Sequence, residues 1–440
     1  MTPHILFIAP SAYTLSGLAT WLDYLLPGLE KLGWRTTLGL VEGARAHRPK
    51  DYLAVHPCQS AIAITCKTAT TQGRRWAVQR AIKQLSPDMV VTVNIPDAVA
   101  ATAELRNQGK SEAKIVMTCH GIQEDLFADM KLFKHALDAV VCTNKLACRL
   151  AEDYAGLDKR SIFYAPCGTD IKPLSSRQKP NNLFTIAYSG RLEQGQKRVH
   201  DLVEIVNNLK RVDIKFRLLI AGSGPEETPL KGSLIDAEEV FFLGQLSKTN
   251  LVTQVYQQAD ALIMPSSWET GPIVIWEAMA TGVPVVSSRY VGSGLENALR
   301  DEENCLLFVV GDWAGASEQI LRLYRDKELW QRIRKAGWQT VKQRYSEVAS
   351  VQQWHEVFEQ VLLKPLSSIQ VVNRSNRPSN NRLDRVLGQA NAEKVRVLLN
   401  RKGPLCDPGG EWPHSWSGTP TEQEENEFGR LAQRLDQCQQ

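Results

Sequence analysis

The most informative segment of the chain spans residues 265–286 and reads PSSWETGPIVIWEAMATGVPVV. An apolar run ends at Met264, small and polar residues follow, and Pro272 stands where a helix would begin, a position that suits proline. The order of apolar run, loop, helix and second apolar run is typical of an α/β unit. Glu269 would then lie in the loop at the carboxyl end of a strand, and Glu277 near the start of the next helix.

Two carboxylates at such a place can accept hydrogen bonds from sugar hydroxyls, and the helix N-terminus between them favours a phosphate. An isolated pair of glutamates eight residues apart is more often a surface loop acid and a capping acid. The rest of the sequence therefore decides between these two interpretations.

The whole chain repeats this alternation of short apolar runs and amphipathic segments, which predicts parallel sheets. Strands are predicted at 4–9, 35–41, 61–66, 89–93, 114–118, 139–143 and 162–165, and again at 184–188, 217–221, 240–243, 261–264, 285–287 and 306–309. Helices are predicted at 18–32, 76–85, 201–209, 248–258 and 273–281, with three more between 313 and 363. The polar, proline-containing stretch 172–183 between the two series predicts a linker.

The length of 440 residues favours two domains and an appendage. We expect an N-terminal domain over 1–175, a C-terminal domain over 184–345, and a helix at 346–363 that could cross back to the first domain. A tail over 364–440 is basic and then acidic, and partly flexible.

Within the tail, residues 364–402 hold 9 basic and 2 acidic side chains, whereas 403–440 hold 2 and 7. The stretch 367–381 reads as flexible, and 383–399 as one amphipathic helix. The remainder is Gly, Pro and acidic polar sequence.

Composition limits the classes of protein that remain. No run of about 18–20 apolar residues occurs, so a spanning helix is not expected, and the first ten residues read as a strand rather than a signal peptide. Nine cysteines without metal or redox spacing indicate reduced thiols in a cytoplasmic protein. Residues 1–180 carry 22 basic and 16 acidic side chains, which is either ordinary scatter or a sign of an anionic partner. That partner could be an acidic glycan or a lipid surface such as the inner membrane face.

The segment 265–286 resembles the retaining GT-B glycosyltransferases of family 4, whose signature is Glu-x(7)-Glu, then Glu-Ala-Met-Ala, then Gly-x-Pro-Val-Val. That resemblance implies two Rossmann-like doubly wound domains facing a central cleft, the first for the acceptor and the second for the donor. It implies an enzyme that moves a hexose-type sugar from a nucleotide-sugar donor to a glycan, lipid or small-molecule acceptor, with retention of anomeric configuration.

Further segments resemble the same family in the same order. IAYSGRLEQGQKR at 186–198 implies Arg191 and Lys197 as cations at the donor diphosphate, where fixed positive charge stabilises a departing phosphate. LLIAGSGP at 218–225 resembles the family's Gly-x-Gly-Pro turn, a weak signal by itself. The regions 291–296 and 304–312 match the elements that close the donor domain.

The resemblance assigns the site residues one by one. Glu269, as a catalytic residue, and Gly271 contact the donor sugar, and Glu277 binds the nucleotide ribose. Gly244 and Gln245, in FLGQL at 242–246, lie by the base.

In the first domain, Ser16-Gly17-Leu18 implies Gly17 at the donor phosphate. Thr118-Cys119-His120-Gly121 implies His120 near the transferred sugar as a second catalytic residue, although a lone histidine after a strand is more often a packing residue.

The sequence also departs from the family pattern. The usual Phe-Gly pair is shifted to Gly271-Pro272, which removes one N–H donor. Cys305 stands where glycine is usual, and Cys167 replaces an asparagine, a change that reads as a turn substitution more than as a reactive thiol.

No Asp-x-Asp occurs, so neither a metal nor another cofactor is predicted, and no nucleic-acid partner is expected. Two other functions remain open, a nucleotide-sugar epimerase with the same two-domain fold and a non-catalytic GT-B-like binding subunit. A nicotinamide-dependent dehydrogenase is disfavoured because the first strand is not followed by Gly-x-Gly-x-x-Gly.

Overall fold

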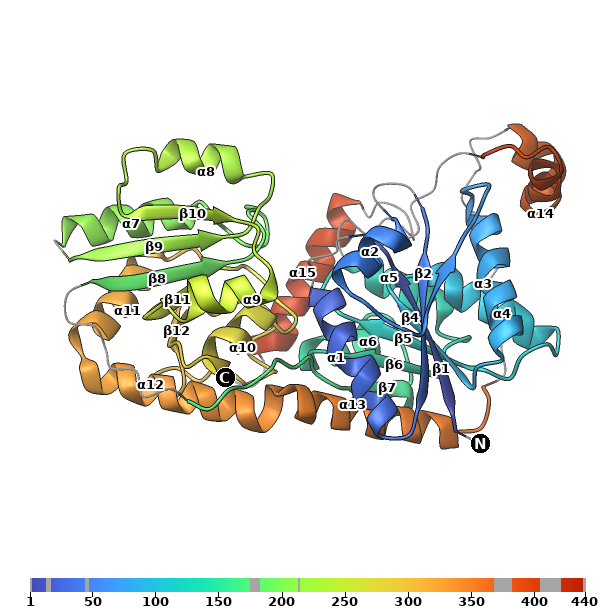
Figure 1. The fold of residues 1–440 in the computed structure, drawn as a ribbon, viewed down its shortest axis with the longest axis horizontal. Coiled ribbons are helices and arrows are strands. Elements are labelled where there is room, and N and C mark those ends of the chain that lie inside the picture. Colours follow the sequence, from blue (N-terminus) through green and yellow to red (C-terminus); the bar gives the residue numbers. More distant parts are fainter. Residues whose placement is uncertain are drawn as a thin grey trace. The chain divides into compact units, whose positions relative to one another are not determined.

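The computed structural model (Figure 1) describes residues 2–12, 17–43, 47–174, 183–212, 214–367, 382–403 and 421–437. The chain divides into two compact units. Unit 1 contains Met1–Thr143, Ala147–Ala165 and Val351–Gly429, and unit 2 contains Asn144–Leu146, Pro166–Ser350 and Arg430–Gln440. Most of the predicted linker and nearly all of the predicted flexible stretch lie outside the described residues.

Unit 1 holds a parallel sheet of seven strands in the order β3-β2-β1-β4-β5-β6-β7. Its strands are β1 (His4–Pro10), β2 (Arg35–Val41), β3 (Ala61–Ile64), β4 (Met89–Val93), β5 (Lys114–Cys119), β6 (Ala139–Cys142) and β7 (Ile162–Tyr164). The helices between them are α1 (Gly17–Lys31), α2 (Pro49–Val55), α3 (Thr71–Leu85), α4 (Pro96–Asn107), α5 (Glu124–Phe133) and α6 (Lys145–Asp153). A short 3-10 helix, Lys159–Ser161, precedes β7.

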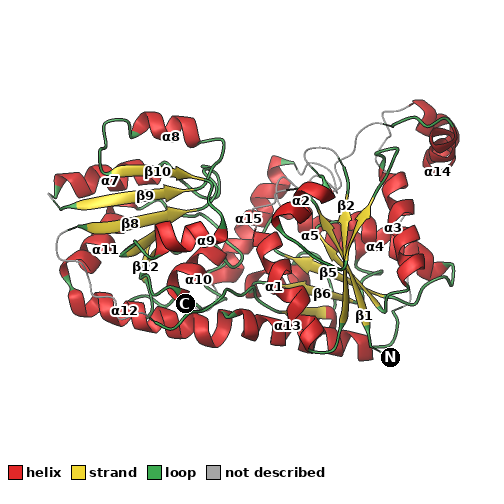
Figure 2. Ribbon diagram, viewed as in Figure 1, coloured by secondary structure: helices red, strands yellow, loops and turns green. Residues whose placement is uncertain are grey.

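Unit 2 holds a parallel sheet of six strands in the order β10-β9-β8-β11-β12-β13 (Figure 2). Its strands are β8 (Phe184–Ser189), β9 (Phe216–Ala221), β10 (Val240–Gly244), β11 (Ala261–Met264), β12 (Val285–Ser288) and β13 (Leu306–Phe308). Its helices are α7 (Asp201–Arg211), α8 (Glu227–Ser233), α9 (Lys248–Asn250) with the π-helical segment Leu251–Tyr256, α10 (Ile273–Ala280), α11 (Trp313–Arg325), and α12 (Lys327–Thr340) with the π-helical segment Val341–Tyr345.

Each sheet has its first strand near the middle and the chain runs outward from it in both directions, which is the doubly wound arrangement. This confirms the predicted fold class of two Rossmann-like α/β units. Every predicted strand is present, because strands of a parallel sheet are covered by helices on both faces and therefore read as continuous apolar runs. Strands β1, β4, β6, β8 and β11, for example, are buried at every residue.

Helix α13 (Glu347–Leu363) is shared between the units, since the division falls between Ser350 and Val351. Its second part belongs to unit 1. There the ring of Trp354 lies 4.8 Å from that of Trp21, and the ring of Phe358 lies 6.0 Å from that of Phe7. These aromatic contacts explain why a helix that follows the second sheet in sequence packs into the core of the first unit.

The tail contains two helices, α14 (Arg382–Leu398) and α15 (Glu422–Gln437). Helix α14 was predicted, although it bends at Gly388, where φ is +73°. Helix α15 was missed among the acidic polar residues. A signal was present: Thr421 and Glu424 bond to each other's backbone N–H groups, the capping box that begins a helix.

None of the helices in the described ranges combines the length and the apolar character that crossing a bilayer requires.

Candidate active site

Three loops of unit 2 meet at the carboxyl ends of β8, β9 and β10. The N–H of Gly190 donates to the carbonyl of Ala221 (3.1 Å), and the N–H of Gly222 donates to the carbonyl of Gly244 (2.8 Å). Gly222 has φ of +137°, and a Cβ there would lie 1.9 Å from the carbonyl oxygen of Gly190. Only glycine fits this contact, so the Gly-x-Gly turn holds the loop that carries Arg191 against its neighbours.

The loop after β11 fixes Glu269. The N–H of Glu269 donates to the carbonyl of Val291, and the N–H of Val291 donates to the carbonyl of Ser267, both at 3.0 Å. Trp268 and Val291 thereby form an isolated parallel bridge. The backbone from Ser267 to the N–H of Glu269 is held by a neighbouring loop, which gives the Glu269 side chain a defined starting point.

The carboxylate of Glu269 belongs to a cluster of four side chains and contacts two of them directly. Lys197 Nζ lies 2.5 Å from Glu269 Oε1, and Gln196 Nε2 donates to Glu269 Oε2 at 3.3 Å. Arg191 Nη2 donates to Gln196 Oε1 at 3.2 Å. The structure therefore brings together the predicted residues Arg191, Lys197 and Glu269, with Gln196 between them.

Charged groups of both signs lie in and beside this cluster. The cations are Arg191 and Lys197, and the carboxylates are Glu269 and Glu193, which accepts from the backbone N–H of Gln196 at 3.0 Å. The side chains of Lys197 and Glu269 are only 16% and 7% exposed. Electrostatic interactions are stronger at such partly buried positions than in bulk water. A diphosphate placed beside Lys197 would meet two cations at positions that are partly shielded from water.

Glu277 lies in the second turn of α10 and is buried. The hydroxyl of Tyr256 donates to its Oε2 at 3.0 Å. Burial raises the pKa of Glu277 to about 7, while the hydrogen bond from Tyr256 acts in the opposite direction. The carboxyl group can therefore gain or lose a proton near neutral pH, and in its ionised form it can accept hydrogen bonds from neighbouring hydroxyls.

The remaining predicted residues of unit 2 are Gly271, Gly244 and Gln245. Gly271 follows Glu269 by two residues, and its φ of +119° is a conformation that favours glycine. Gly244 ends β10 with φ of +65°, and a Cβ there would meet no atom within 4 Å. Gln245 follows it and is exposed.

Gly17 and His120 belong to unit 1, so the structure does not place them together with the residues of unit 2. Gly17 is the first residue of α1 and follows a segment outside the described residues. His120 follows β5, with its ring centroid 4.6 Å from that of Trp21 and 6.4 Å from that of Trp354. Burial lowers the pKa of His120 to about 3, so its imidazole is neutral at neutral pH.

The two unusual cysteines are poor nucleophiles. Cys167 is buried, and burial raises the pKa of its thiol to about 12. Burial also raises the pKa of Cys305, whose Sγ donates to the carbonyl of Arg300 at 3.5 Å. Because the thiolate is the reactive form, the raised pKa agrees with the prediction that Cys167 is a turn substitution, which stays a prediction.

Sequence reasoning missed two residues of this site. Gln196 stood inside the segment that supplied Arg191 and Lys197, but nothing in its position indicated that it would bridge to Glu269. Tyr256 lies in the predicted helix 248–258 and reaches Glu277 only because the π-helical segment packs beside α10.

Comparisons with known proteins extend over both units. The family described as Glycosyltransferase Family 4 matches residues 15–172, and the family described as Glycosyl transferases group 1 matches residues 173–340. Together the two matches cover the chain from the start of α1 to the end of α12.

Two curated relatives show the range of this similarity. N-acetyl-alpha-D-glucosaminyl L-malate synthase of Bacillus anthracis is 29% identical over 169 residues, 38% of this chain and 43% of the relative. Phosphatidyl-myo-inositol mannosyltransferase of Mycobacterium leprae is 29% identical over 228 residues, 50% and 59% of the two chains. The matched part thus spans about half the length of these relatives.

Among solved structures, that of Anabaena HepE in complex with UDP-glucose superposes with a TM-score of 0.66. The sequence identity is 18%, and the superposition covers 81% of this chain and 99% of the other. At this level of identity the likeness concerns the fold.

Proposed function

The chain belongs to the group 1 glycosyltransferases of the GT-B fold, and from this we propose that it transfers a hexose-type sugar from a nucleotide-sugar donor to a glycan or lipid-linked acceptor, with retention of anomeric configuration. The observation that carries the proposal is the cluster of Arg191, Gln196, Glu269 and Lys197 at the carboxyl ends of β8 and β11. It supplies both a cation for a diphosphate and a carboxylate for sugar hydroxyls.

In this proposal Lys197 and Arg191 face the diphosphate, whose negative charge grows as the bond to the sugar breaks. The ammonium group of Lys197, paired with Glu269 at 2.5 Å, is held in position for this contact. Preorganised cations stabilise that developing charge more than they stabilise the ground state. Such a site needs no divalent metal, and we propose that activity is unchanged by chelators.

Glu269 and Glu277 would each contact a different part of the donor. Glu269, oriented by Gln196 and by its own backbone, accepts hydrogen bonds from hydroxyls of the sugar, with Gly271 beside it. Glu277 accepts hydrogen bonds from the ribose hydroxyls, near the base-binding residues Gly244 and Gln245. Because hydroxyls donate better to a carboxylate than to a neutral acid, nucleotide binding would favour the ionised form of Glu277.

His120 and Gly17 would contribute from unit 1. The neutral imidazole of His120 suits a hydrogen bond to an uncharged sugar hydroxyl rather than an ion pair. The N-terminus of α1, which begins at Gly17, suits a phosphate. The described residues suggest no protein nucleophile, so we propose attack by the acceptor on the face that the diphosphate leaves, with the leaving phosphate accepting the proton.

The names of two similar proteins support a choice of donor and acceptor to test first. HepE was solved with UDP-glucose, and the mycobacterial relative is named for a phosphatidylinositol acceptor. We therefore propose a uridine diphosphate sugar and a glycan or glycolipid acceptor as the first pair to examine.

The first measurement is the binding of UDP-, GDP- and ADP-glucose by calorimetry. The second is the slow release of nucleotide from each donor when no acceptor is added and water takes its place. In the Lys197→Met variant, we expect the rate of nucleotide release to fall by about 100-fold or more, the usual effect of removing one transition-state donor. The exposed Lys327 of the same unit provides a matched control, and Lys327→Met should leave the rate unchanged.

Three other results would overturn the proposal. Isomerised donor without any transfer would indicate the epimerase, and no binding of any nucleotide sugar would indicate the non-catalytic subunit. Equal rates for Lys197→Met and wild type would remove Lys197 from the mechanism. The anomeric configuration of the released sugar, followed by NMR, tests retention separately.

A further inference from the structure

Helix α14 is held to unit 1 by one polar face. Ala392, Glu393 and Arg396 are its buried residues. The carboxylate of Glu393 accepts hydrogen bonds from the hydroxyls of Thr68 and Thr70, the latter at 2.7 Å. Because Thr70 is the N-cap of α3, the carboxylate of Glu393 lies at the N-terminus of that helix, where negative charge is favoured.

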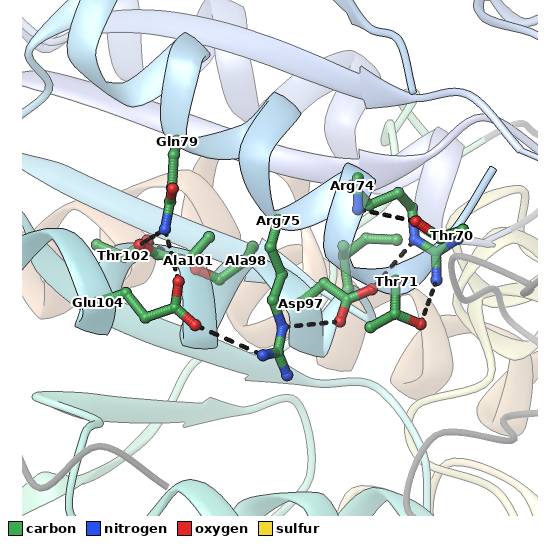
Figure 3. Close-up of polar contacts among 12 residues, drawn as sticks. Thr70, Thr71, Arg74, Arg75, Gln79, Asp97, Ala98, Ala101, Thr102 and Glu104 are labelled. Carbon is green, nitrogen blue, oxygen red and sulfur yellow. Dashed lines mark hydrogen bonds and ion pairs between the residues drawn. The ribbon is translucent and has the colours of Figure 1, made fainter. Parts of the chain in front are cut away.

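Helix α3, on which α14 rests, is itself firmly fixed to α4 (Figure 3). Arg74 Nε donates to Asp97 Oδ2 at 3.1 Å, and Arg75 Nε lies 3.6 Å from Asp97 Oδ1. Gln79 Nε2 and Arg75 Nη1 both reach the carboxylate of Glu104, at 2.7 and 3.5 Å. Arg74 and Asp97 are almost wholly buried, so α14 sits on a rigid part of unit 1.

The other faces of α14 expose large apolar side chains. Val386 is 81% and Leu398 is 84% exposed, and Leu387, Val397 and Leu399 are 40% to 63% exposed. These side chains lie on both sides of the kink at Gly388, and so many large apolar groups on one short segment are unusual for a surface that only meets water. Only the small Ala392 is apolar among the buried residues of α14, so the larger apolar side chains point away from the protein, unlike the usual pattern in which the apolar side faces it.

The charges that this segment exposes are all basic. Its two acidic residues, Asp384 and Glu393, both pair with the buried Arg396. Arg382, Arg385, Lys394, Arg401 and Lys402 are exposed. The acidic side chains are turned inward, and the basic and apolar ones outward.

We infer that α14 is an interfacial helix that binds unit 1 to an anionic lipid bilayer, with Val386, Leu398 and their apolar neighbours inserted among the lipids and the basic side chains at the headgroups. Exposed apolar residues combined with Lys and Arg suit such an interface. A nucleic acid would match the charges but leave the apolar side chains in water, and an acidic protein partner would need no insertion. Membrane binding goes beyond the proposed transfer reaction and does not depend on it.

The experiment measures sedimentation of the full chain with vesicles of phosphatidylcholine alone and of phosphatidylcholine mixed with phosphatidylglycerol. We expect binding to the mixed vesicles only, weakened by added salt. Each of Lys394→Gln, Arg401→Gln and Lys402→Gln should lower the partition coefficient about fivefold, the effect of about 1 kcal/mol per charge. Leu398→Ser should lower it by up to about tenfold.

Matched controls lie in unit 2. Lys327→Gln and Lys335→Gln remove exposed charges of the same kind, and Ile235→Ser removes an apolar side chain that is 80% exposed. All three should bind the mixed vesicles like wild type. Thermal melts of every variant should superimpose, since none of the substituted side chains is buried.

The inference fails if wild type does not sediment with the mixed vesicles, or if the α14 variants and the controls bind these vesicles equally. It also fails if Leu398→Ser abolishes a dimer or a nucleic-acid complex instead. Nucleotide release from the donor, measured without lipid, should be the same in all these variants, so a failure here is distinguishable from a failure of the proposed activity.

Discussion

The carboxyl group of Glu277 accepts a hydrogen bond from Tyr256, and burial raises its pKa to about 7 from an ordinary value of 4.5. The folded protein therefore holds this proton more tightly than the unfolded chain does. Below pH 4.5 the carboxyl group is protonated in both states, so its ionisation does not lower the free energy of unfolding. As the pH rises from 4.5 to 7 the unfolded chain ionises first, so this group makes the folded state progressively less stable.

We therefore predict that Glu277→Gln is more stable than wild type above pH 7, by about 2–3 kcal/mol, and equally stable near pH 4. Glutamine keeps an oxygen that can accept the hydrogen bond from Tyr256 but cannot ionise. Urea unfolding of both proteins from pH 4 to pH 8 measures the difference. A constant difference over this range would mean that Glu277 does not titrate where its surroundings imply.

Residue-level sequence reasoning was most successful where a function needs a particular chemical group. Arg191, Lys197 and Glu269 were chosen as cations and a carboxylate for a nucleotide sugar, and they do lie together. The roles assigned to them remain predictions. Gln196 could not be identified in the same way, since an amide at that place matters only because of the two loops it joins.

At the scale of elements, the site depends on how closely the loops after β8, β9 and β10 approach. Gly222 makes that approach possible, because its missing side chain leaves room for the carbonyl of Gly190. The sequence showed a Gly-x-Gly turn, but only the distance to the neighbouring loop shows why glycine is required there.

We predict that Gly222→Ala destabilises the protein by about 2–3 kcal/mol, from a disfavoured φ and a backbone clash, and weakens nucleotide binding as the loops separate. Gly232 gives a matched control within α8, where a Cβ would meet nothing within 4 Å. Gly232→Ala should be neutral or stabilising by about 0.5–1 kcal/mol. Thermal unfolding with and without UDP measures both effects, and similar behaviour of the two variants would contradict the assignment.

At the scale of the whole molecule, α15 takes part in both units. In unit 1, the ring of Phe428 lies 5.3 Å from that of Phe127 and 5.1 Å from that of Tyr154. In unit 2, the carboxylate of Asp436 accepts hydrogen bonds from the N–H groups of Gly292, Gly294 and Leu295, at distances of 2.8 to 3.1 Å. One helix of the tail thus completes two separate sets of contacts.

We predict that substitutions at the two ends of α15 destabilise different parts of the protein. Phe428→Ala should cost about 3–5 kcal/mol, as expected for a buried aromatic side chain, and should increase hydrogen exchange around α5 and α6. Asp436→Ala should cost about 1–3 kcal/mol, because it leaves three N–H groups without their acceptor, and should increase exchange in the loop after β12. Exchange that rises in the same peptides for both variants would refute this division.

The sequence by itself determined the two doubly wound sheets, because strands covered on both faces must be apolar along their whole length, and this pattern is local. It also indicated the chemical groups of the predicted donor site, since their types and order can be read directly. Only the tertiary structure decided which groups meet: Gln196 with Glu269, Glu393 with the start of α3, and Asp436 with the loop after β12. These contacts join residues tens to hundreds of positions apart, and they depend on how the elements pack rather than on any local pattern.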